Sequence, residues 1–150
     1  MNVELLLKVK KHILAKPSRL YMNRFILRDK DLSEYRTKRD KRYVEFFSKE
    51  WNEKGKRLAP SCGTVGCIAG WVVLLNDEKA KNHRVIYKAM ELLNINNTEA
   101  SKLFYVSNWP SKFKDEYLLV TKNKIKAHAR IVGQVIDFFI KTNGTMIEEV

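Results

Sequence analysis

Apolar residues recur at intervals of three and four positions along most of this chain, with lysines and other polar residues between them. This period is typical of α-helices that bury one side. Residues 18–59 fit either a short strand or hairpin or a turn and a helix. The sequence therefore predicts a mostly α single compact domain, residues 1–150, of about five to seven helices. The predicted helices cover residues 2–15, about 40–54, 64–76, 82–94, 99–106 and 111–120, and a last one between Thr121 and Asn143.

The first and last helices have the clearest apolar stripes. Pro17 ends the first helix, and Asn143-Gly144 is expected to end the last one. Asn82, Thr98 and Thr121 are candidate caps of the helices that follow them. The row predicted at helical spacing in the first helix consists of Val3, Leu6, Leu7, Lys10, Ile13 and Leu14. The stripe of the last helix consists of Ile125, Ala129, Val132, Ile136, Phe139 and Ile140, and the buried side of the helix over 82–94 consists of Val85, Ile86, Ala89, Met90, Leu92 and Leu93.

Length and composition agree with one folded domain. A chain of 150 residues can bury a core without disulfides. An apolar share of 45% and a charged share of 31% indicate a folded protein with a heavily charged surface. No apolar run approaches the roughly 18 residues of a membrane span, and the first residues do not form a secretory signal. We therefore expect a cytoplasmic protein.

The segment CGTVGCIAGW, residues 62–71, concentrates two cysteines, three glycines and a tryptophan in a lysine-rich chain. If Thr64 caps the helix that follows, Cys67 lies in its first turn. Free amides and the helix dipole would there lower the pKa of the thiol. Cys67, or alternatively Cys62, would then be a candidate nucleophile with His128 or His12 as its base.

A packing role is the favoured interpretation of the same segment. Small residues at three- and four-residue spacing let a second helix approach closely, and Trp71 would anchor the contact. A zinc site would need further ligands at paired spacing, and a disulfide between Cys62 and Cys67 does not suit a reducing cytoplasm. We therefore expect no metal and no cofactor. The residues to which this interpretation gives a structural role are Cys62, Gly63, Thr64, Gly66, Cys67, Gly70 and Trp71.

The same segment carries a resemblance. Together with LKVKKHILAKPSRLYM, ELLNI, EASKLFYVSNWP and the closing helix, it resembles an uncharacterised family of small bacterial, cyanobacterial and phage proteins with a C-G-T-x-x-C-x-A-G-W core. The resemblance covers most of the chain except about residues 27–58, which it marks as a charged insertion. It implies a shared architecture and no established activity. The residues that match the core are Cys62, Gly63, Thr64, Cys67, Ala69, Gly70 and Trp71.

Positive charge dominates the chain, with a formal net charge of +12 that lies mainly in residues 1–60. Such a field attracts nucleic acid, acidic protein surfaces and anionic lipid alike. In residues 36–42, cations stand beside aromatic residues, which either stack on nucleic-acid bases or belong to the core. The candidate binding residues are Arg36, Lys38, Arg39, Lys41 and Arg42, with a second row of Lys122, Lys126 and Arg130 on the outer side of the last helix.

Several motifs that would indicate a specific activity are missing from the sequence. It contains no P-loop, no dinucleotide-binding glycine motif, no HExxH and no GxSxG. Zinc-finger spacing and RNA-binding motifs are also missing, so binding would depend on the phosphate backbone. The sequence favours a non-enzymatic small basic binding protein, of phage accessory or inhibitor type, that engages nucleic acid or an acidic protein surface. The alternative is a thiol-dependent enzyme with Cys67 as nucleophile.

Overall fold

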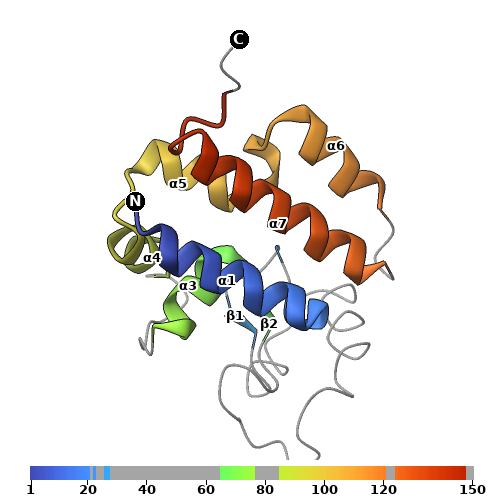
Figure 1. Ribbon diagram of the computed structural model, residues 1–150, viewed down its shortest axis with the longest axis horizontal. Helices are drawn as coiled ribbons and strands as arrows, with labels where there is room; N and C mark the ends of the chain where they lie inside the picture. The colour runs from blue at the N-terminus through green and yellow to red at the C-terminus, as the bar shows by residue number, and fades with distance from the viewer. Residues whose placement is uncertain (21, 23–25, 28–64, 77–84, 121–123, 148–150) are drawn as a thin grey trace, which may run out of the picture.

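The computed structural model describes residues 1–20, 22, 26–27, 65–76, 85–120 and 124–147, which form a mostly α single domain (Figure 1). The predicted fold class is confirmed. No helix within these residues is long and apolar enough to cross a membrane. The α-helices are α1 (Val3–Ala15), α3 (Ile68–Leu75), α4 (Val85–Leu93), α5 (Asn97–Phe104), α6 (Ser111–Leu119) and α7 (Ile125–Lys141). The short elements are the 3-10 turns η1 (Pro17–Arg19) and η5 (Val106–Asn108) and the strands β1 (Ile26–Leu27) and β2 (Val65–Gly66).

The first helix forms where the sequence predicts it, but it buries a different side. The side chain of Asn2 caps α1 by accepting a hydrogen bond from the amide of Leu5 (3.1 Å). The buried side chains are Leu5, Leu6, Val9 and Ile13, whereas Val3, Leu7 and Leu14 are 37–46% exposed. The predicted stripe is therefore only partly right. Apolar residues cover most of the circumference of α1, so the period alone does not decide which of them its neighbours bury.

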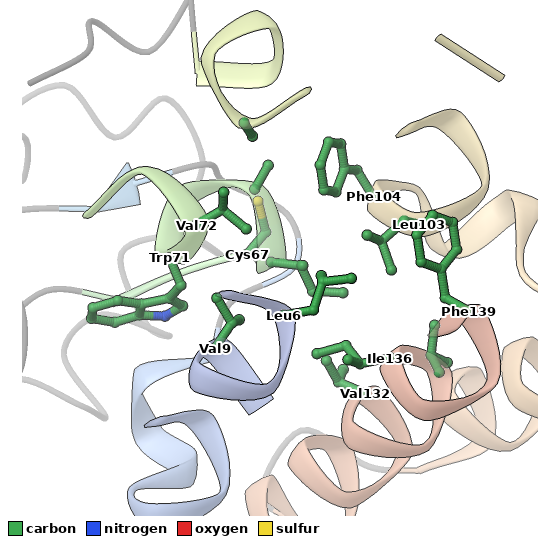
Figure 2. Packing of buried hydrophobic residues seen from close by; sticks show 14 of the residues in the cluster. Leu6, Val9, Cys67, Trp71, Val72, Leu103, Phe104, Val132, Ile136 and Phe139 are labelled. Carbon is green, nitrogen blue, oxygen red and sulfur yellow. The ribbon is translucent and has the colours of Figure 1, made fainter. Parts of the chain in front are cut away.

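The core is built around α3. All residues from Ile68 to Leu74 are buried, and Trp71 is fully enclosed. Figure 2 shows Leu6 and Val9 of α1 next to this helix, with side chains of α5 and α7 completing the cluster. A helix that is apolar on all sides gains stability only from such surroundings.

The start of α3 differs from the prediction because a strand pair precedes it. Val65 and Gly66 pair with Leu27 and Ile26 in an antiparallel ladder. The helix therefore begins at Ile68 instead of Thr64, and Gly66 belongs to a strand. A short strand within residues 18–59 is confirmed at Ile26–Leu27, although its partner lies outside that segment. The helix predicted over 40–54 lies outside the described residues.

The helices of the second half agree closely with the predicted ranges, and their ends differ in detail. In α4, Val85, Ala89 and Leu93 are buried, while the other predicted core residues, Ile86, Met90 and Leu92, are partly buried against them. The cap of α5 is Asn96, not Thr98. Its side chain accepts from the amide of Glu99, and the Glu99 carboxylate accepts from the amide of Asn96, both at 2.9 Å. This reciprocal capping box satisfies two amides at once. The candidate caps Asn82 and Thr121 lie outside the described residues.

Three helices form one layer of the domain, with α7 between α1 and α6 (Figure 1). α1 and α7 run in opposite directions, and Lys10 of α1 forms an ion pair with Asp137 of α7 (2.7 Å). On the other side, Glu116 of α6 pairs with Arg130 of α7 (2.5 Å). The end of α1 and the turn η1 thus lie beside the start of α7.

Replacement of glycine by alanine should have opposite effects on the free energy of unfolding at two positions. At Gly133, inside α7, a Cβ would lie 3.5 Å from Leu14 Cδ1, an ordinary contact. Gly133→Ala should raise the free energy of unfolding by about 0.5–1 kcal/mol, because glycine is a poor helix former. Gly144 has φ +81°, and a Cβ there would lie 3.0 Å from a carboxylate oxygen of Glu99. Gly144→Ala should lower the free energy of unfolding by about 1–2 kcal/mol. Urea unfolding followed by circular dichroism measures both, and a stabilising Gly144→Ala would contradict the backbone strain expected at this position.

Candidate functional site

Cys67 lies in the core at the start of α3 and is 2% exposed. It is the N-cap residue, but its side chain makes no capping hydrogen bond. Burial raises the pKa of the thiol to about 11, against a smaller lowering by the backbone amides of Gly70, Ala69 and Cys67 itself. The predicted lowering of this pKa is therefore wrong, because loss of water disfavours the thiolate more than the amides favour it.

Tyr117 of α6 belongs to the same buried region as Cys67. Burial, and secondarily the charge that Cys67 would carry as a thiolate, raise the pKa of the phenol to about 12. The ring of Tyr117 packs edge-on against Trp109 with centroids 5.3 Å apart. At neutral pH both the thiol and the phenol are protonated, so neither is poised to act as a nucleophile or a base.

His128 lies next to Tyr117, but its hydrogen bonds are made to the backbone. The two rings are 4.5 Å apart, and His128 Nε2 lies 3.2 Å from the carbonyl oxygens of Tyr117 and Val120. Carbonyl oxygens only accept, so Nε2 carries the proton. His128 thereby ties the end of α6 to α7, and no hydrogen bond connects it to Cys67 among the residues that the structure describes.

His12, the other predicted base, is part of a separate cluster with Trp71 and Arg19. Its ring packs against Trp71 in a tilted arrangement with centroids 4.3 Å apart, and Arg19 donates hydrogen bonds to its Nδ1 (3.2 Å) and its carbonyl oxygen (2.9 Å). Burial, followed by the charges of Arg19 and Lys8, lowers the pKa of His12 to about 4. His12 is thus neutral at pH 7, and its Nδ1 already accepts a hydrogen bond.

Trp71 is fully buried in α3, and its indole has a partner that the sequence does not reveal. Its indole N–H donates to the carbonyl oxygen of Arg19 (2.9 Å). This hydrogen bond fastens η1 to α3, although 52 residues separate them. Gly70 is buried in α3 beside it. The remaining core-motif residues, Cys62, Gly63 and Thr64, lie outside the described residues.

No group of three or more potential metal ligands occurs in the part of the chain that the structure describes, and Cys67 is a free thiol there. The possible involvement of Cys62 in a metal site or a disulfide falls outside the described residues. So do the predicted binding residues Arg36, Lys38, Arg39, Lys41, Arg42 and Lys122. Of the predicted basic residues, the structure places Lys126 and Arg130, both on the exposed side of α7.

Comparison of this chain with protein families, curated proteins and solved structures finds no match. The resemblance noted for the core motif therefore stays a prediction that rests on the motif residues alone.

The burial of Cys67 predicts slow chemical modification. In a Cys62→Ser variant, alkylation of Cys67 should proceed at the rate at which the protein opens, because the thiolate that reacts is scarce below a pKa of about 11. Timed labelling with mass-spectrometric detection, repeated in urea, measures this rate. Fast labelling in the native protein, with an apparent pKa below the roughly 8.5 of a free cysteine, would contradict it.

The lowered pKa of His12 predicts that the protein loses stability in acid. The unfolded chain binds a proton at this residue near pH 6.5 and the folded chain only near pH 4, so the unfolded state binds more protons between these values. The free energy of unfolding should therefore fall as the pH is lowered from about 6.5 to about 4. His12→Asn keeps an acceptor for Arg19 without titrating, and it should remove this part of the pH dependence in urea unfolding. An unchanged pH profile would disprove the assignment.

Proposed function

We propose that this protein is a non-enzymatic binding protein that holds nucleic acid by its phosphate backbone. The supporting observation is the antiparallel packing of α1 and α7 (Figure 1), which brings cations from two distant parts of the sequence to the same end of the domain. We call this surface the basic end, and it consists of Lys16, Lys124, Lys126 and Arg130.

The charges at the basic end are only partly balanced. Arg130 pairs with Glu116 of α6. Within the described ranges, no carboxylate pairs with Lys124 or Lys126, and both are exposed. They stand at the start of α7, where cations add to the positive end of the helix dipole and reduce the stability of the helix. A positive surface that is kept at the expense of stability supports a role in binding anions.

The chemistry of Cys67 supports a binding role over the alternative of a thiol-dependent enzyme. A nucleophilic cysteine needs an accessible thiolate and a nearby base. Cys67 is buried with a raised pKa, and the two histidines considered as its base make hydrogen bonds elsewhere.

Charge reversal at the basic end tests this function. Lys126→Glu should weaken binding to a mixed-sequence DNA duplex several-fold and should reduce the slope of log K against log salt by about 1–2, because a phosphate contact is lost and repulsion is added. Fluorescence anisotropy of a labelled duplex at several salt concentrations measures both quantities.

Lys141→Glu is the matched control, because Lys141 is an exposed lysine at the opposite end of the same helix. It makes the same change in net charge and should have a clearly smaller effect. Equal losses in both variants would mean that the overall field, and not the basic end, attracts the DNA. If the wild-type protein binds neither duplex nor single-stranded DNA nor RNA, nucleic acid is excluded, and an acidic protein surface becomes the better candidate partner.

A further inference from the structure

Among the α-helices of the described residues, α6 alone contributes no fully buried side chain to the core. α1, α4 and α5 each bury at least three, and α3 and α7 bury more. Partly buried rings hold α6 on α7: Phe113 lies against Phe138 with centroids 5.4 Å apart, and Tyr117 lies against His128. α6 is therefore a peripheral helix without a buried side chain.

The last turn of this peripheral helix exposes two adjacent leucines. Leu118 is 67% exposed and Leu119 is 83% exposed. Adjacent residues on a helix point roughly 100° apart, so the two leucines do not form the three- and four-residue seam that a partner helix would cover. Complete burial of each leucine side chain would strengthen an interaction by about tenfold or more. Their exposure is thus a substantial apolar feature that the domain itself does not use.

The two leucines lie next to the basic end. His128 of α7 is 3.2 Å from the carbonyl oxygens of Tyr117 and Val120, and Arg130 pairs with Glu116. These contacts place the last turn of α6 against the first turns of α7. Lys124 and Lys126 precede His128 by four and two residues, so aliphatic side chains and unbalanced cations lie in the same region of the surface.

This combination suits an anionic lipid surface better than nucleic acid or another protein. Leucine adds little to the binding of phosphates, and two divergent leucines do not match a helical partner. A bilayer accepts separate apolar side chains between its headgroups while lysines remain at the lipid phosphates. Each cation near an anionic bilayer strengthens the binding about fivefold. The charge of the basic end and the positions of the leucines are therefore both complementary to such a bilayer.

We infer that the end of α6 and the basic end together dock on anionic membranes, with Leu118 and Leu119 inserted between headgroups and Lys124 and Lys126 on the lipid phosphates. The attachment is peripheral and reversible. This activity goes beyond the proposed binding of nucleic acid. Both activities need the lysines of the basic end, whereas Leu118 and Leu119 are needed for membrane docking alone.

Co-sedimentation with vesicles tests this inference. The protein should bind phosphatidylcholine vesicles that contain phosphatidylserine, bind pure phosphatidylcholine vesicles much more weakly, and lose affinity as salt is added. The double variant Leu118→Ser/Leu119→Ser should lose roughly tenfold or more in vesicle affinity and keep its affinity for the DNA duplex. Lys126→Glu should weaken binding to both probes.

The matched control is the double variant Tyr87→Ser/Ile147→Ser, which replaces two large exposed side chains far from α6 in the sequence. Tyr87 is 70% exposed and Ile147 is 66% exposed. It should keep vesicle binding. Unchanged circular dichroism of both double variants would show that they fold. The inference is overturned by equal losses in the two double variants, by equal binding to charged and uncharged vesicles, or by leucine-dependent dimerisation in light scattering without vesicle binding. Vesicle binding without DNA binding would support this inference while rejecting the proposed function.

Discussion

The burial of α3 on every side is the constraint on which the rest of the domain depends. A helix without a polar face has to be enclosed by other parts of the chain. α1, α4 and α5 contact it directly, and α7 closes the core from the side of α1. Trp71 fixes the arrangement because its indole N–H is bonded to the carbonyl oxygen of Arg19. The outer sides of the enclosing helices then form the surfaces that are available for binding.

The same constraint determines the chemistry of Cys67. The start of a helix favours a thiolate, whereas burial disfavours it, and the raised pKa shows that burial has the larger effect here. Burial also disfavours the charged form of His12. Together with the charge of Arg19 it lowers the pKa of this imidazole, which stays neutral at pH 7. Both residues are therefore better understood as parts of the packing around α3 and Trp71 than as a catalytic pair.

Most helices could be predicted from the sequence because their signals are local. The period of three and four residues located α1, α4 and α7, and Pro17 and Gly144 marked two of the ends. The start of α3 could not be predicted, since Val65 and Gly66 take their conformation from a strand far away in the sequence. The exposure of Leu7 was missed because α1 has apolar residues on more than one side. The partner of Trp71 is a backbone carbonyl, for which the sequence has no signal.

The site was less predictable than the fold, for a related reason. Lys126 and Arg130 were identified from their spacing on one helix. Their position beside the end of α1 depends on how α1 and α7 pack, which is a tertiary property. The sequence gives no apolar stripe for the helix that contains Leu118 and Leu119, and the peripheral position of α6 leaves both exposed.

The strand pair β1–β2 has a consequence for how this chain can vary. It joins Ile26 to Gly66 and Leu27 to Val65, so the two ends of residues 28–64 are held at neighbouring positions directly before the central helix. Whatever conformation those residues take, the entropy of closing such a loop changes slowly with its length, by about 0.6 kcal/mol for each doubling. A change in the length of the chain between the two strands therefore costs little in the entropy of closing it, as long as the ladder keeps its two ends together.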